Sequence, residues 1–104
     1  MIKFGEKISV VMITLNEEDS VAKVINDITK IDHRIEINIV DSSTDKTGHI
    51  AETMGAKVIY QLPPIGYGPA MHKALNSATR EIVITLDCDD TYPVNQIDNF
   101  SKLI

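Results

Sequence analysis

The chain has 104 residues, which is enough for one domain with its own hydrophobic core. Its 43% hydrophobic and 24% charged residues are ordinary for a globular protein, and its net charge of −5 argues against a nucleic-acid partner, which would require a basic face. One cysteine excludes an internal disulfide, and no apolar run approaches the roughly 20 residues that cross a bilayer. We therefore expect a cytoplasmic protein, with contact at the cytoplasmic face of a membrane left open.

The first predicted strand covers residues 8–13 and leads into the polar segment that contains Asn16 and Glu17. Asn16 is a good N-cap, so a helix is expected after it, as far as about Lys30. Its apolar face is expected to consist of Val21, Val24, Ile25 and Ile28. Glu17 has two interpretations: a first-turn acid near the positive end of the helix dipole, or a side chain that faces a crevice at the strand ends.

The second predicted strand, residues 35–40, stops at Asp41 and enters a turn rich in Ser and Thr. Ser43 or Thr44 is expected to cap the next helix, with Asp45 in its first turn. Capping does not account for Asp41, which is expected at the tip of the strand. Hydroxyl groups and free helix N–H groups at such a turn can hold a phosphate, a ribose or a base edge. The helix should end at Gly55, in the position where helices commonly carry glycine.

The third predicted strand, residues 57–62, is followed by a turn with two glycines and a helix that begins near Pro69. The apolar stripe of this helix is expected to contain Ala70, Met71, Ala74, Leu75 and Ala78. Paired glycines before a helix can let the backbone approach a phosphate, but this signal is weak. The histidines share no metal-ligand spacing, and each is interpreted as a surface residue: His33, His49 and His72.

The fourth predicted strand, residues 82–86, has an apolar composition typical of a fully buried strand and runs directly into Asp87, Cys88 and Asp89. In an extended segment the two carboxylates share one face, and Cys88, on the other, is interpreted as a small buried apolar residue. Carboxylates at this spacing repel each other unless a cation or a proton lies between them, and Mg²⁺ commonly takes one or two carboxylates together with substrate phosphates. The alternative is that these acids belong to a solvated turn.

A last helix is expected to begin at Pro93, with Val94, Ile97 and Phe100 on its apolar face. It has no C-cap before the chain ends. We interpret this as a cut through a larger protein, and we expect the apolar face to pack against further sequence or against a second copy of the chain, in a homodimer.

Strict alternation of strands and helices predicts an α/β fold with a parallel sheet in the order 3-2-1-4 and helices on both faces. Ligands of such sheets bind beyond the carboxyl ends of the strands. The polar residues expected at this edge are Asn16, Glu17, Asp41, Asp87 and Asp89. Without a cation these acids would repel one another, so the pattern favours a metal-bound ligand that carries phosphate.

Four segments in order resemble motifs of one family: Val10 to Glu18, Asp41 to Thr47, Gly66 to Ala70, and Leu86 to Pro93. The chain is similar to the N-terminal half of an inverting GT-A-fold glycosyltransferase of family 2, the group that includes dolichyl-phosphate mannose and glucose synthases. The resemblance implies a Rossmann-like, nucleotide-sugar-binding half of a glycosyltransferase domain. It departs from the family at Ile13, where Pro is usual, at Arg80, where Gly is common, and in the second motif, which is one residue short.

The resemblance implies a donor site formed by Ile13, Leu15, Asn16, Glu17, Val40, Asp41, Asp87, Cys88 and Asp89. Asp41 would hydrogen-bond the base, with Val40 beside it, and Asp87 and Cys88 would contact the ribose side. Mg²⁺ or Mn²⁺ would be held by Asp89, with Asp87, and would bridge the diphosphate. The implied reaction transfers a sugar from a UDP- or GDP-linked donor to a polyprenyl or dolichyl phosphate or a glycan. No residue is assigned as a catalytic base, so residues 1–104 are expected to bind the donor without catalysing transfer.

Two other functions stay open at this point. A nucleotidyltransferase or a Toprim-like domain can also combine a strand-end Glu with Asp-x-Asp. However, the chain has no basic stripe for nucleic acid and no glycine-rich loop with a basic residue after the first strand. The other alternative is a non-catalytic nucleotide-binding module, which would bind a nucleotide without turnover.

Overall fold

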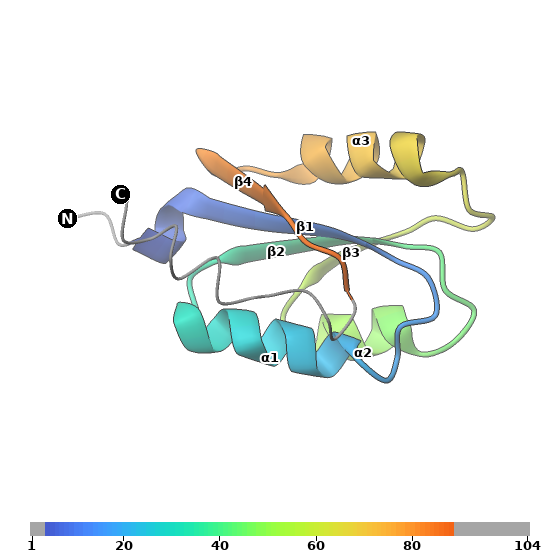
Figure 1. Ribbon diagram of the computed structural model, residues 1–104, viewed down its shortest axis with the longest axis horizontal. Coiled ribbons are helices and arrows are strands. Elements are labelled where there is room, and N and C mark those ends of the chain that lie inside the picture. The colour runs from blue at the N-terminus through green and yellow to red at the C-terminus, as the bar shows by residue number, and fades with distance from the viewer. Residues whose placement is uncertain (1–3, 89–104) are drawn as a thin grey trace.

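The structure, a computed structural model, describes residues 4–88, which form one parallel sheet in the strand order β3-β2-β1-β4. The elements are η1 (Phe4–Lys7), β1 (Ile8–Thr14), α1 (Val21–Ile31), β2 (Glu36–Asp41), α2 (Thr47–Thr53), β3 (Lys57–Tyr60), α3 (Tyr67–Ser77) and β4 (Ile82–Thr85). Helix α3 covers one face of the sheet, and α1 and α2 cover the other (Figure 1). The predicted fold class and strand order are confirmed. Asp89 and the helix expected from Pro93 lie outside the described residues.

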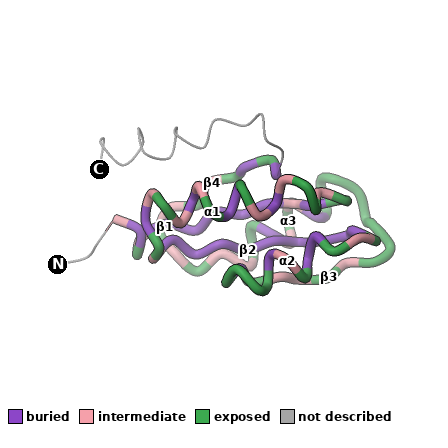
Figure 2. Tube along the Cα trace, turned by 90° about the horizontal axis from the view of Figure 1, so that it is seen from below, coloured by how far each residue is buried: buried purple, intermediate pink, exposed green. Residues whose placement is uncertain are grey.

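The core consists of two layers because successive side chains of β1 point to opposite faces of the sheet. Ile8, Val10 and Met12 pack with the apolar residues of α1 and α2, whereas Val11 packs with Val40 and the small residues of α3. Both β1 and β2 are buried along nearly their whole length (Figure 2). Burying one Val or Ile side chain contributes about 1.5–3 kcal/mol, so the two central strands supply much of the favourable free energy of folding. Between residues 4 and 88, no helix has the length and apolar character needed to cross a membrane.

The predicted N-caps of α1 and α2 are wrong, although the apolar faces of the helices are largely as expected. Helix α1 begins at Val21, with Ser20 as its N-cap, so Asn16 lies a full turn too early to cap it. Helix α2 begins at Thr47, and Asp45 accepts a hydrogen bond from its backbone N–H at 2.9 Å, a role expected for Ser43 or Thr44. The expected end of α2 is confirmed, since Gly55 has a φ of 97°.

Strand β4 is half-buried, so the expectation of a fully buried strand is wrong. Its burial alternates along the strand, with Ile82 and Ile84 packed against the core beneath α1 and α2, and with Val83 39% exposed on the other side. The physical reason is position: β4 pairs with β1 alone among the described strands and lies at the edge of the sheet. Leu75, expected in the buried stripe of α3, is also 42% exposed.

A buried carboxylate ties the connection between α3 and β4 to the sheet. Glu36, 6% exposed at the start of β2, accepts hydrogen bonds from the backbone N–H of Thr79 at 2.9 Å and from its hydroxyl at 2.7 Å. Its other partners include the Ser9 hydroxyl and the Lys57 ammonium, which lies 2.9 Å away. Burial raises the pKa of Glu36, but the hydrogen bonds from Lys57, Ser9 and Thr79 outweigh it and lower the pKa to about 2.

This network predicts a pH-dependent effect of the Glu36→Gln substitution. The pKa of Glu36 is about 2 in the folded chain, below its ordinary 4.5, so its contribution to stability is fully present above pH 4.5 and is lost as the pH falls toward 2. At pH 7 the variant should have a free energy of unfolding about 1–3 kcal/mol lower than wild type, because charge-assisted hydrogen bonds are lost. In urea denaturation the difference should shrink between pH 4.5 and 2. A difference that stays constant there, or an equal effect of the exposed Glu81→Gln, would contradict this role.

Candidate functional site

The parallel register brings the ends of three strands to one edge of the sheet. Thr14, the last residue of β1, lies opposite Asp41, the last residue of β2. On the other side of β1, Val11 lies opposite Thr85, and the backbone N–H of Leu86 continues the pairing by donating to the carbonyl of Val11 at 3.2 Å. The segments that follow the three strands therefore meet, as the alternating pattern predicts.

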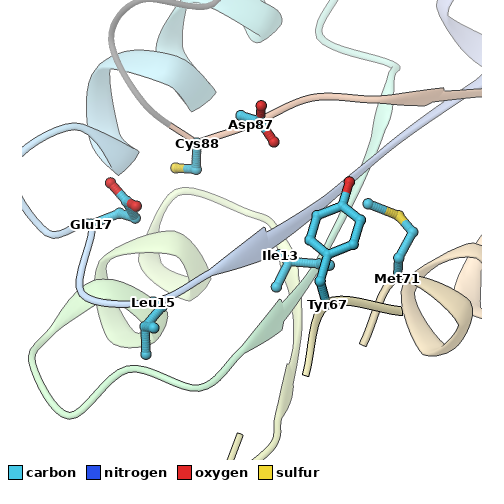
Figure 3. Close-up of a pocket in the computed structure, with 7 residues that line it drawn as sticks. All are labelled: Ile13, Leu15, Glu17, Tyr67, Met71, Asp87 and Cys88. Carbon is cyan, nitrogen blue, oxygen red and sulfur yellow. The ribbon is translucent and has the colours of Figure 1, made fainter. Parts of the chain in front are cut away.

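A cavity of about 270 Å³ opens at this edge, between the end of β1, the start of α3 and the segment after β4 (Figure 3). Its lining residues are Ile13, Leu15, Glu17, Tyr67, Met71, Asp87 and Cys88. Five of these belong to the predicted donor site: Ile13, Leu15, Glu17, Asp87 and Cys88. Asp87 is exposed, and Glu17 is half-buried. The cavity thus combines an apolar lining with two carboxylates.

A second cavity of about 260 Å³ adjoins the first, because Ile13, Leu15 and Tyr67 line both. Its lining residues are Ile13, Thr14, Leu15, Ser42, Pro64, Ile65, Gly66, Tyr67 and Ala70. Sequence reasoning did not assign Tyr67, Met71 or the turn before α3 to the site. An aromatic residue placed between two glycines at the start of a helix was the available signal, since such a residue has little opportunity to pack in the core.

Asp41 supports this edge from beneath and lines neither cavity. Its side chain is 2% exposed, and Oδ1 accepts hydrogen bonds from the hydroxyls of Thr14 and Ser43, each at 2.6 Å. Val40 is buried as well and packs against α3. Asp41 and Val40 therefore lie behind the wall that Thr14 and Ser42 present to the second cavity. Direct contact of Asp41 with a base stays a prediction.

Asn16 joins the loop after β1 to the loop after β2. Its backbone φ of 56° lies in the left-handed region, which Asn tolerates better than most residues. The side-chain carbonyl accepts hydrogen bonds from the backbone N–H groups of Thr44 and Asp45, at 2.9 and 3.3 Å. In return, the backbone N–H of Asn16 donates to the Ser43 hydroxyl at 2.7 Å. Asn16 therefore holds the chain that carries Leu15 and Glu17, the two residues on either side of it.

Two more contacts hold the backbone segments that carry Glu17 and Asp87. The backbone N–H of Glu17 donates to the Thr47 hydroxyl at 2.9 Å, and that hydroxyl donates to Asp45. Burial opposes the charged form of Asp45, but its hydrogen bonds, led by those from Thr47, together outweigh this effect and keep its pKa below the ordinary value. Across the cavity, the Ser20 hydroxyl donates to the carbonyl of Cys88 at 3.1 Å, which ties the segment after β4 to the start of α1.

The donor set fits a hard divalent cation that takes few protein ligands. Within residues 4–88, no three His, Cys, Asp or Glu side chains are grouped so as to enclose a metal ion. Mg²⁺ and Mn²⁺ sites for phosphate ligands do not need such a group, because one or two carboxylates suffice when phosphates and water complete the coordination. Asp87 offers an exposed carboxylate at the cavity, and the histidines at 33, 49 and 72 are exposed surface residues, as expected. Asp89, the second predicted metal ligand, lies outside the described residues.

The model of the family described as "Glycosyl transferase family 2" matches residues 9–104 of the chain. The chain belongs to this family. The family predicted from the four sequence motifs is thus confirmed.

Similar proteins and solved structures agree with this assignment. The "Dolichyl-phosphate hexose transferase" of Haloferax volcanii is 46% identical over 100 residues, which are 95% of this chain and 43% of that protein. A solved structure of glucosyl-3-phosphoglycerate synthase from Mycobacterium tuberculosis, in complex with Mn²⁺, UDP-glucose and phosphoglyceric acid, matches 82% of this chain at 36% identity and a TM-score of 0.69. Mannosyl-3-phosphoglycerate synthase from Rubrobacter xylanophilus matches 80% at 28% identity and a TM-score of 0.72. The chain spans 43% of the first relative and 34% and 30% of these two structures.

The hydrogen bonds between Asn16 and the loop after β2 predict that Asn16→Ala lowers the stability of the whole fold and also loosens that loop. The variant loses the acceptor for the Thr44 and Asp45 amides and places alanine at a positive φ, which together should lower the free energy of unfolding by about 1–3 kcal/mol. Hydrogen exchange measured by NMR should become faster at the amides of Thr44 and Asp45. Asn26→Ala, at an exposed position of α1, is the matched control. Unchanged exchange at these two amides would show that the hydrogen bonds of Asn16 do not hold the loop.

Proposed function

We propose that this chain is the donor-binding part of a glycosyltransferase that uses a UDP- or GDP-linked sugar together with Mg²⁺ or Mn²⁺. The observation that carries the proposal is the cavity at the carboxyl edge of the sheet, where Glu17 and Asp87 face an otherwise apolar lining in a chain of family 2. The M. tuberculosis relative crystallised with Mn²⁺ and UDP-glucose supports the choice of ligand. The same family membership weighs against a nucleotidyltransferase or a Toprim-like domain.

The proposed roles are those that the family resemblance implies. Asp87 and Cys88 would contact the ribose side of the donor, and Asp89, with Asp87, would hold the metal ion. When bound, the metal supplies Lewis-acid chemistry, neutralising charge on the departing nucleoside diphosphate. Glu17 faces the same cavity from the loop after β1, and the hydrogen bonds of Asn16 and Thr47 keep it there.

The proposed acceptor is a polyprenyl phosphate, such as dolichyl phosphate, at the cytoplasmic face of a membrane, with a glycan as the second choice. The name of the Haloferax volcanii relative supports the lipid. The transfer proceeds with inversion, so a phosphate oxygen of the acceptor attacks the anomeric carbon while the nucleoside diphosphate leaves from the opposite side. Such an acceptor is already anionic, so its activation needs no general base, but it still needs groups that position it.

The metal role is tested by calorimetry of UDP and GDP with the 104-residue chain. Binding should require Mn²⁺ or Mg²⁺, be lost in Asp89→Ala, and weaken about tenfold or more in Asp87→Asn, since each change removes a carboxylate from the metal and ribose side. Asp27→Asn, which alters an exposed ion pair with Lys23 on α1, should bind as wild type. Equal affinity in the presence of EDTA would show that the metal does not mediate binding.

The division between donor binding and transfer is tested by an assay with UDP-glucose or GDP-mannose and dolichyl phosphate. We expect the 104-residue chain to bind the donor and give no measurable transfer, because its candidate side chains are all assigned to the donor and its metal. The intact Haloferax volcanii relative serves as the positive control, since this chain spans 43% of its length. Turnover by the 104-residue chain at a rate near that of the control would overturn this division.

A further inference from the structure

Tyr67, the first residue of α3, is an aromatic side chain placed outside the core. It is 69% exposed, more than any other large apolar or aromatic residue in the described part of the chain. It lines both cavities, and its ring stands with Ile13 and Met71 in the first of them (Figure 3). An exposed aromatic ring gains free energy when another molecule covers it. The exposure of Tyr67 therefore indicates a ligand-binding surface.

The chemistry of the two cavities differs sharply. The first contains the carboxylates of Glu17 and Asp87, whereas the second is bounded, among the described residues, by uncharged side chains only. Its hydroxyl-bearing residues are Thr14 and Ser42, on the side of the strand ends, and Tyr67 itself. A metal-bound diphosphate suits the first cavity, and a flat, uncharged ring suits the second.

The volumes of the two cavities also favour one ligand that occupies both. Each cavity, at 260–270 Å³, is just below the range of about 300–1,000 Å³ that is usual for small-molecule sites. A nucleoside diphosphate therefore needs both, with its uncharged end in one and its charged end in the other. Tyr67 stands where the two meet. Gly66, with a φ of 93°, lets the chain turn sharply into α3 and places Tyr67 at this junction.

We propose that Tyr67 is a positioning and affinity-determining residue on which the nucleobase of the donor stacks in the uncharged cavity, while the diphosphate occupies the cavity of Glu17 and Asp87. This assignment rests on the proposed function and adds Tyr67, which lies inside the third family motif at a position for which the resemblance implies no role. Every nucleobase has a π-face, so the ring contributes affinity for UDP and GDP alike and leaves the choice of base to the polar groups of the cavity.

The test is calorimetry of the 104-residue chain with UDP and, separately, with inorganic pyrophosphate, both in the presence of Mn²⁺. Tyr67→Ala should weaken UDP binding about tenfold and leave pyrophosphate binding unchanged, since pyrophosphate has no base to stack. Tyr67→Phe keeps the ring and should bind UDP as wild type does. Leu62→Ala is the matched control, because Leu62 is 57% exposed and lines neither cavity. Circular dichroism checks that each variant is folded.

The outcomes separate this inference from the proposed function. Wild type that binds neither UDP nor pyrophosphate overturns both. Wild type that binds UDP, with Tyr67→Ala equally tight, overturns the role of Tyr67 alone, as does an equal loss of affinity for UDP and pyrophosphate in that variant. If Tyr67→Ala loses affinity for geranyl phosphate and not for UDP, the ring serves the chain of a lipid acceptor and the assignment to the nucleobase is wrong.

Discussion

Strand β1 is hydrogen-bonded in parallel on both sides, to β2 and to β4, and the site depends on this double pairing. Three strands that run in one direction in fixed register must end at one edge, so the loops that follow them cannot avoid each other. In this chain those loops carry Glu17 and Asp87. In the function proposed above, a cation and phosphates bind beside these carboxylates, which would link the topology of the sheet directly to ligand binding.

The two edges of the sheet use buried carboxylates for different purposes. At the edge formed by the amino ends of the strands, the Glu36 carboxylate accepts hydrogen bonds from Ser9, Lys57 and Thr79. These bonds hold the segment between α3 and β4 against the sheet. At the carboxyl edge, Asp41 accepts from Thr14 and Ser43 and steadies the wall behind the cavities. Both residues have little access to water, whereas Asp87 is exposed. The buried carboxylates of Glu36 and Asp41, whose oxygens accept hydrogen bonds, thus contribute to stability, whereas the exposed carboxylate of Asp87 is accessible to a ligand.

The features that sequence could predict are those encoded within one element. Apolar periodicity gave the strands and helices, and strict alternation gave their order in the sheet. What failed depends on contacts between distant segments. Asn16 looks like a local helix cap, yet its partners, Thr44 and Asp45, lie 28 and 29 residues away. The exposure of Val83 follows from the edge position of β4, which composition does not reveal. Tyr67 was not predicted as a site residue because it lies in a glycine-rich turn, where no helical or strand periodicity indicates which way a side chain faces.

The central claim is that a metal-bound nucleotide occupies the carboxyl edge of the sheet, and paramagnetic NMR with UDP and Mn²⁺ tests it most directly. Mn²⁺ broadens the resonances of nearby nuclei, so the amide signals of Glu17, Asp87 and Cys88 should disappear first as the ion is added to the UDP-saturated chain. Those of Glu36 and Lys57, at the opposite edge, should persist. Loss of signal centred on Glu36 and Lys57, or spread evenly over the sheet, would contradict the account.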